Sequence, residues 1–137
     1  MIKLLSNLFE NLHILQNIYI KNNFFRKKVS YSMDKEDIIV EEYFKCKNEG
    51  FYVDVGCYHP LQRNNTMLLY QKGWRGINID ISDFSIKLFK FLRPDDFNLN
   101  VAISNEEGEI DMFFQKNSLN CQPLKKIMQK MLFKEIF

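Results

Sequence analysis

Paired cysteines are missing from this chain. Its three cysteines, Cys46, Cys57 and Cys121, are odd in number and widely spaced, and no Cys-x-x-Cys pair occurs. A disulfide framework and a structural zinc site both need paired cysteines, so the sequence argues against both. Unpaired thiols are typical of proteins in a reducing compartment, and we therefore expect a cytoplasmic protein.

A long uninterrupted apolar run is also missing. Polar residues interrupt the first twenty positions before a run approaches the roughly 18 apolar residues of a membrane span, and no small-residue cleavage site follows. We therefore expect no stable insertion into a membrane.

The apolar residues of this first segment recur at helical spacing instead. They predict an amphipathic helix, which the basic Lys21 and Arg26–Lys28 follow. We expect its apolar face to pack on the domain or on a partner, with peripheral contact to a membrane as the alternative. That face consists of Leu5, Leu8, Phe9, Leu12, Leu15 and Tyr19.

A large excess of either charge is absent. The formal net charge of +2 is too small to indicate binding to nucleic acid or to an anionic surface. The apolar content of 46% and the charged content of 26% are those of an ordinary globular protein. With 137 residues, we expect one domain with a sizeable core.

After a helical lead-in over residues 1–30, strand and helix patterns alternate. Gly73 and Arg93-Pro94 stand where two of the helices should end. The alternation predicts an α/β fold with a partial, Rossmann-like parallel sheet over residues 31–137. The expected elements are a helix capped by Ser32 or Asp34 and ended by Gly50, a strand over 51–56, a helix capped within 64–66, a strand over 74–81, a helix over 83–92, a strand over 97–103, a strand over 109–114 that forms a hairpin with it, and a helix from Pro123 to Leu132.

The first of these strands carries the most informative polar residue. Asp54 lies within an apolar run and is followed by Gly56. A charge inside a buried strand needs a role, and glycine lets the backbone approach a ligand closely. Asp80 ends the next strand, 24 residues after Gly56, and this is near the separation expected of a carboxylate that binds ribose hydroxyls. The structural alternative is that Asp80 only caps the following helix.

Glycine is scarce around this motif. None of the five glycines lies at positions 57–61, where a G-x-G-x-x-G phosphate loop would need them, and no P-loop lysine is present. A cofactor with a pyrophosphate is therefore disfavoured. A nucleoside cofactor without phosphate, such as S-adenosylmethionine, fits better, with Asp54 ordering the turn or reaching the amino group of the cofactor.

Six blocks of the sequence form one joint pattern: Phe51–Pro60, Asn64–Thr66, Leu69-Tyr70, Gly73–Asp80, Arg93–Asp96 and Asn98–Ser104. Together they resemble the FkbM-type methyltransferases. The resemblance covers roughly residues 30–121, although Met33 and Lys35 replace a glutamine and a glycine of the family pattern. It implies a Rossmann-like enzyme that uses S-adenosylmethionine to O-methylate a small-molecule or glycan hydroxyl.

The resemblance also implies a set of cofactor-binding residues. Asp54 and Gly56 match the first cofactor motif of the family, Asp80 matches its ribose-binding acid, and Asp96 and Ala102 fall near the adenine side. The complete set is Asp54, Gly56, Cys57, Tyr58, Asn65, Thr66, Asp80, Ile81, Asp96 and Ala102. We predict no metal ligands.

His59 is the only histidine near this site and is a candidate general base. The favoured interpretation is structural, as a turn histidine that hydrogen-bonds its own loop before Pro60. The residues do not identify another base.

The expected elements make up only one β-α-β-α-β half of a doubly wound fold. The later strands of the family, implied to hold the acceptor pocket, have no counterpart, so we expect a truncated N-terminal part of a methyltransferase. The competing interpretation is a non-catalytic half-Rossmann module that self-associates through an exposed sheet edge. A nucleotide-binding enzyme of another type is a third.

Overall fold

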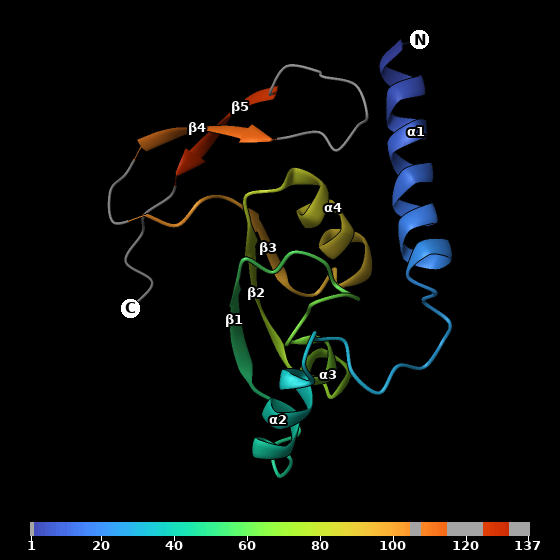
Figure 1. The fold of residues 1–137 in the computed structure, drawn as a ribbon, viewed down its shortest axis with the longest axis vertical. Helices are drawn as coiled ribbons and strands as arrows, with labels where there is room; N and C mark the ends of the chain where they lie inside the picture. The colour runs from blue at the N-terminus through green and yellow to red at the C-terminus, as the bar shows by residue number, and fades with distance from the viewer. Residues whose placement is uncertain (1, 105–107, 115–124, 132–137) are drawn as a thin grey trace.

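The computed structural model describes residues 2–104, 108–114 and 125–131 (Figure 1). The chain begins with two consecutive helical segments, and its strands then alternate with helices up to β3. The elements are α1 (Ile2–Leu15), the π-helical turn η1 (Gln16–Lys21), α2 (Glu36–Tyr43), β1 (Phe51–Val55), α3 (Met67–Gln71), β2 (Arg75–Asp80), α4 (Asp83–Leu92), β3 (Phe97–Asn100), β4 (Gly108–Phe114) and β5 (Lys125–Met131).

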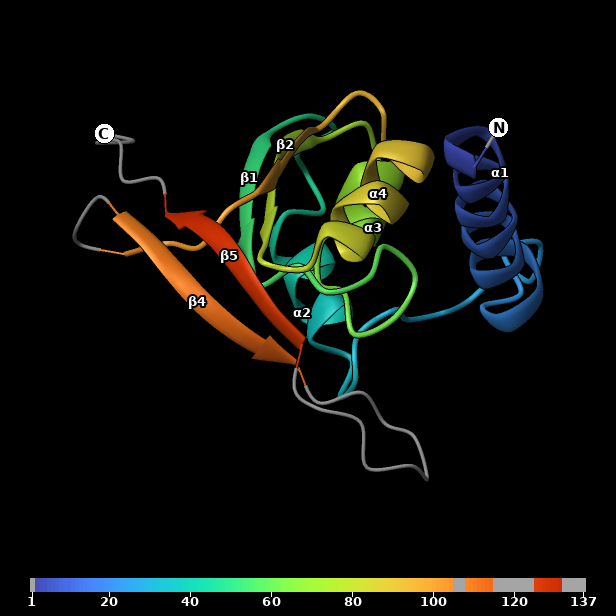
Figure 2. The same cartoon turned by 90° about the horizontal axis from the view of Figure 1, so that it is seen from above.

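Three strands form a parallel sheet in the order β1-β2-β3. Val53 pairs with Ile77, and Ile77 pairs with Phe97, so the three strands run side by side in register. Helices α3 and α4 cover the same side of this sheet (Figures 1 and 2). The expected partial Rossmann-like α/β fold is confirmed, with β1 at an edge of the three-stranded sheet.

Local signals set the ends of several helices. The Ser82 hydroxyl accepts a hydrogen bond from the Ser85 N–H at 3.2 Å and caps α4, as expected. Helix α4 ends at Leu92, before Arg93-Pro94, and Gly73 follows α3 with a φ of +106°.

The cap of α2 differs from the expectation. Lys35 occupies the N-cap position in the left-handed region, with a φ of 66°, and neither Ser32 nor Asp34 is the N-cap. The buried Asp37 reaches back instead and accepts hydrogen bonds from the Ser32 hydroxyl at 2.8 Å and the Tyr31 N–H at 2.6 Å. The carboxylate of the first turn therefore satisfies the donors that precede the helix.

The end of the chain was predicted wrongly in two respects. Residues 125–131 form strand β5 and not a helix, and β4 pairs with β5 and not with β3. The two strands are antiparallel and pair along their full length, from Gly108 with Met131 to Phe114 with Lys125. The apolar residues of so short a run fit both the 3.6-residue period of a helix and the two-residue period of a strand. Pairing with β4 therefore overrides the local helical pattern.

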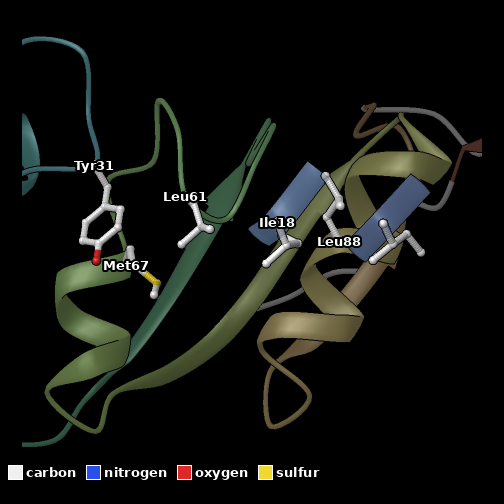
Figure 3. Close-up of a cluster of buried hydrophobic side chains, with 6 residues drawn as sticks. Ile18, Tyr31, Leu61, Met67 and Leu88 are labelled. Atoms are coloured by element: carbon white, nitrogen blue, oxygen red, sulfur yellow. The ribbon is translucent and has the colours of Figure 1, made fainter. Parts of the chain in front are cut away.

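The main apolar core joins the N-terminal segment to the helices. Ile18 of η1 lies next to Leu88 of α4, and Leu61 and Met67 extend the cluster toward Tyr31 (Figure 3). These side chains are at least nine-tenths buried. Burial of Ile18 fixes η1 against the loop that follows β1.

The two faces of the sheet differ in chemistry. Tyr52, Asp54, Asn78 and Asn98 share the side covered by the helices. On the opposite side, the apolar positions of β1 and β3 are exposed to between 39% and 69%, whereas Ile77 and Ile79 of the central strand are half-buried and buried; the exposed positions are Phe51, Val53, Val55, Phe97 and Leu99. The covered face of the sheet is therefore a polar layer, and the open face is a hydrophobic one.

Helix α1 does not pack as expected. Its side chains Leu5, Leu8, Phe9, Leu12 and Leu15 are exposed, and only Tyr19 of the expected apolar face lies against the core. Of the two alternatives expected for this face, packing on the domain is not what α1 shows, and packing on a partner stays a prediction. No helix among the described residues is long and apolar enough to cross a membrane.

Candidate functional site

The carboxyl ends of the three parallel strands lie at one edge of the sheet, and three loops leave from it. Residues 56–60 follow β1, Ile81 follows β2, and Ala102 lies two residues after β3. Ligands of open α/β sheets bind at this edge. The structure thereby brings Gly56, Tyr58, Asp80 and Ile81 to the same end of the sheet.

Gly56 makes the turn out of β1. Its φ of +74° lies in a region that residues with a Cβ rarely adopt, and nothing lies within 4 Å of where a Cβ would be. The backbone conformation, and not crowding, therefore requires glycine here. Tyr58, with a φ of 54°, continues the strained turn, and its side chain is half exposed.

Asp80 links two of the loops at this edge. Its Oδ2 accepts a hydrogen bond from the Tyr58 N–H at 2.8 Å, and its Oδ1 accepts one from the Ser82 N–H at 2.7 Å. The side chain of Asn100, at the end of β3, donates to the Asp80 backbone carbonyl at 3.0 Å. Because Ser82 is the N-cap of α4, Asp80 is not, and its carboxylate instead joins the loop after β1 to the start of α4.

The Asp80 carboxylate retains capacity for further hydrogen bonds. Each of its oxygens can accept two, and each receives one from the backbone contacts described. The residue is also only partly buried. A carboxylate held in this way can accept hydrogen bonds from two neighbouring hydroxyl groups.

Asp54 belongs to a buried network below the edge. Its Oδ2 accepts hydrogen bonds from the Thr66 hydroxyl at 3.0 Å and from the Asn64 amide at 3.3 Å. Burial raises the pKa of the Asp54 carboxyl, while these hydrogen bonds and the nearby Arg93 oppose the rise. Of the two roles considered for Asp54, these contacts correspond to ordering the turn.

The sequence did not single out Arg93 as part of this network. Its guanidinium is fully buried and donates to the Thr66 hydroxyl at 2.9 Å, to Asn64 Oδ1 at 2.6 Å and to the Pro60 carbonyl at 3.2 Å. Arginine is almost never fully buried without partners. The only local signal was its place before a proline, which predicted a helix end and not burial.

Two predicted cofactor contacts point into the interior. Thr66 is buried and its hydroxyl is used by Asp54 and Arg93. Cys57 is 1% exposed and packs with Ile86 and Phe89, and burial raises the pKa of its thiol. Their side chains therefore pack in the interior, under the loops of the candidate site, whereas Asn65 beside Thr66 is exposed.

Asp96 was expected near the adenine side, and the structure corrects this. It precedes β3 and therefore lies at the amino ends of the strands, opposite the candidate site. Its carboxylate accepts hydrogen bonds from the Tyr52 hydroxyl at 2.5 Å, the Gly76 N–H at 2.9 Å and the Asn78 amide at 2.9 Å. Asp96 thus crosslinks the start of the sheet.

His59 is a structural residue of the loop after β1. Its Nδ1 accepts a hydrogen bond from the Leu61 N–H at 2.9 Å, so the proton of the neutral ring is on Nε2, which lies 2.8 Å from Asn17 Oδ1. Burial, and then Lys28 and Arg93, lower the pKa of His59 to about 4. A ring that is buried and hydrogen-bonded in this way is poorly suited to remove a proton from an acceptor.

A small hollow of ≈ 210 Å³ opens beside the edge. It is smaller than the roughly 300–1,000 Å³ typical of small-molecule pockets. Its lining includes Tyr58 and His59 from the first loop, Phe84 and Ser85 from α4, and Asn17 and Asn22 from the N-terminal segment. Among the residues that the structure describes, no group of histidine, cysteine and acidic residues could hold a metal ion.

Comparisons with family models, with curated proteins and with solved structures found no match. The assignment of a function therefore rests on the residues and the geometry of the carboxyl edge.

Proposed function

We propose that the carboxyl edge of the sheet binds S-adenosylmethionine and that the chain serves an O-methyltransferase acting on a small-molecule or glycan hydroxyl. The observation that carries this proposal is the position of Asp80 at the strand end, with both carboxylate oxygens able to accept further hydrogen bonds. The resemblance of residues 51–60 and 73–80 to the FkbM-type enzymes supports the choice of cofactor.

The shape of the first loop also favours a cofactor without phosphate. Gly56 gives one exposed turn of backbone, and Cys57 to Leu61 supply none of the glycines that a phosphate cradle needs. S-adenosylmethionine supplies an electrophilic methyl group, and the hydroxyl that accepts it must release a proton. Since His59 is buried and its pKa is lowered to about 4, we assign that proton to solvent or to a group outside the described residues.

Calorimetric titration with S-adenosylhomocysteine, the demethylated product, tests the proposal. We expect binding by the wild type and a loss of affinity of about tenfold or more in Asp80→Asn, because a hydrogen bond to a charged acceptor is lost. Asp83→Asn is the matched control, since Asp83 is an exposed acid three residues away. A wild type that binds NAD or ATP more tightly would contradict the choice of cofactor.

A ribose-modified ligand distinguishes a direct contact between Asp80 and the ribose from an indirect effect of Asp80 on the shape of the loop. If Asp80 accepts from the ribose, the 2′-deoxy analogue should bind the wild type more weakly but bind Asp80→Asn no more weakly than the parent ligand does. An equal penalty in both proteins would show that Asp80 only shapes the loop. Methyl transfer to sugar acceptors then measures activity independently of affinity.

A non-catalytic interaction module is the second candidate. The observation that favours it is the open apolar face of the sheet next to the edge strand β1. Specific self-association without affinity for S-adenosylhomocysteine would favour this function over the first.

A further inference from the structure

Helix α1 presents its apolar side chains to solvent. At about 100° per residue, these positions occupy an arc of about 140° on one side of the helix. Their exposed fractions range from 38% to 78%, and the residues are Leu4, Leu5, Leu8, Phe9, Leu12 and Leu15. We call this set the outward face of α1.

The opposite side of α1 makes the contacts with the domain. The Glu10 carboxylate forms an ion pair with Lys87 of α4, and the His13 ring stacks on Phe84 at 4.6 Å between centroids. Ile14, on the same side, is 7% exposed. The polar side of an amphipathic helix thus faces the protein and the apolar side faces outward, the reverse of a helix that covers a core.

The outward face continues past α1 into an aromatic cluster. The Tyr19 ring lies 5.4 Å from Phe24 and 5.3 Å from Phe25, and Ile20 and Phe25 are strongly exposed. A hollow of ≈ 700 Å³ runs along the junction and is lined by Phe9, Leu12, His13, Leu15, Gln16, Tyr19 and Ile20. The apolar surface therefore extends over both helical segments and their exit.

Basic residues accompany this surface. Lys21, Arg26 and Lys27 are exposed and lie beside the aromatic cluster in the sequence. The first 30 residues contain five basic residues and one acid, Glu10, whereas the remaining chain contains fourteen basic and sixteen acidic residues. The small net charge of the whole chain thus conceals a positive N-terminal segment.

We propose that residues 4–28 bind an anionic lipid surface, with α1 lying in the plane of the interface and its outward face in the acyl boundary. Leucine and phenylalanine on one face, aromatic rings at the junction and basic residues beside them form the pattern of interfacial helices. The contacts of Glu10 and His13 hold the domain on the polar side of α1, so the domain would lie away from the lipid. Because the basic cluster gives charge complementarity, lipid is a better occupant of this face than an apolar protein surface.

Flotation with vesicles tests the proposal on the full chain. We expect the protein to float with vesicles of an equal mixture of phosphatidylcholine and phosphatidylglycerol, and much less with phosphatidylcholine alone. Phe9→Glu should reduce the partition coefficient by about tenfold or more, because it puts a charge into the acyl boundary. Ile39→Glu is the matched control, since Ile39 is an equally exposed apolar residue on α2.

The contribution of the basic residues to lipid binding has its own test. Arg26→Glu with Lys27→Glu should also reduce partitioning by about tenfold or more, and added salt should weaken the binding of the wild type. Lys45→Glu with Lys90→Glu makes the same change of charge at exposed positions elsewhere and should leave partitioning unchanged.

Three outcomes would overturn the proposal. The first is the absence of flotation with anionic vesicles by a folded wild type. The second is flotation that Phe9→Glu reduces no more than Ile39→Glu does. The third is a wild-type dimer in light scattering that Phe9→Glu converts to a monomer without any binding to vesicles, which would assign the outward face to a second copy of the chain.

Discussion

His59 shows how a residue with catalytic chemistry is used as a structural one. Its two ring nitrogens join the loop after β1 to the N-terminal segment, through the Leu61 N–H and Asn17 Oδ1. These contacts suit the neutral ring, and protonation would put a second donor against the Leu61 N–H. The depressed pKa of about 4 follows mainly from burial.

This makes stability depend on pH with a definite sign. The unfolded chain binds a proton at the ordinary His pKa of 6.5, and the folded protein only near 4, so the unfolded state holds more protons between these values. We expect His59 to cost about 2 kcal/mol of unfolding free energy between pH 7 and pH 5. Urea unfolding of the wild type and of His59→Gln at both pH values measures the difference.

The comparison between the two proteins isolates His59 from other titrating groups. Asp54 acts in the opposite direction, because burial raises its pKa, but it is present in both proteins. His13→Gln is the control, since it replaces the exposed ring that stacks on Phe84 and leaves His59 in place. If His59→Gln loses as much unfolding free energy between pH 7 and pH 5 as the wild type does, the pH dependence does not come from His59.

At the scale of elements, Arg93 joins the end of α4 to the connection between β1 and α3. Its guanidinium donates to Pro60, Asn64 and Thr66, and Thr66 is the N-cap position of α3. The guanidinium also lies over the rings of Tyr70 and Phe89 at 5.2 and 5.0 Å. Two helices and the loop of the candidate site therefore depend on one buried cation.

We expect Arg93→Met to lower the unfolding free energy by about 3–5 kcal/mol, because it removes the donor of three buried hydrogen bonds and the positive charge that favours the ionised form of Asp54. Arg75→Met is the matched control. Arg75 also lies over Tyr70, at 4.5 Å, but its side chain is 43% exposed in an ion pair with Asp95. An exposed pair contributes about 0–1 kcal/mol. Equal losses in urea unfolding would refute the special role of Arg93.

At the scale of the whole molecule, two apolar surfaces are open among the residues that the structure describes. One is the outward face of α1, and the other is the uncovered face of the sheet, with β1 at its edge. The two surfaces lie on different elements of the fold, so substitutions in one can be tested without changing the other.

We predict that the sheet face causes self-association at high concentration, because exposed apolar area and an open strand edge favour pairing with another chain. Light scattering should show the mass rising with concentration in the wild type and less so in Phe51→Lys with Val55→Lys. Ile39→Lys with Tyr43→Lys, on the exposed surface of α2, is the control. A wild type that stays monomeric would contradict the prediction, and a response only to Phe9→Glu would assign association to α1.

Local signals determined much of the order of elements. The N-cap at Ser82, the stop at Arg93-Pro94 and the turn at Gly73 each act through the backbone of a few neighbouring residues, so their consequences could be read from the sequence. The alternation of strands and helices likewise predicted the parallel sheet and the edge at which Gly56 and Asp80 meet.

The tertiary structure decided what depends on partners distant in the sequence. Pairing with β4 made residues 125–131 a strand, contacts with Tyr52 and Gly76 placed Asp96 at the amino ends of the strands, and partners in another loop allowed Arg93 to be buried. Helical periodicity likewise predicted the apolar face of α1 but not the direction it faces. A periodic pattern states which residues share a face, whereas the packing of whole elements decides what that face contacts.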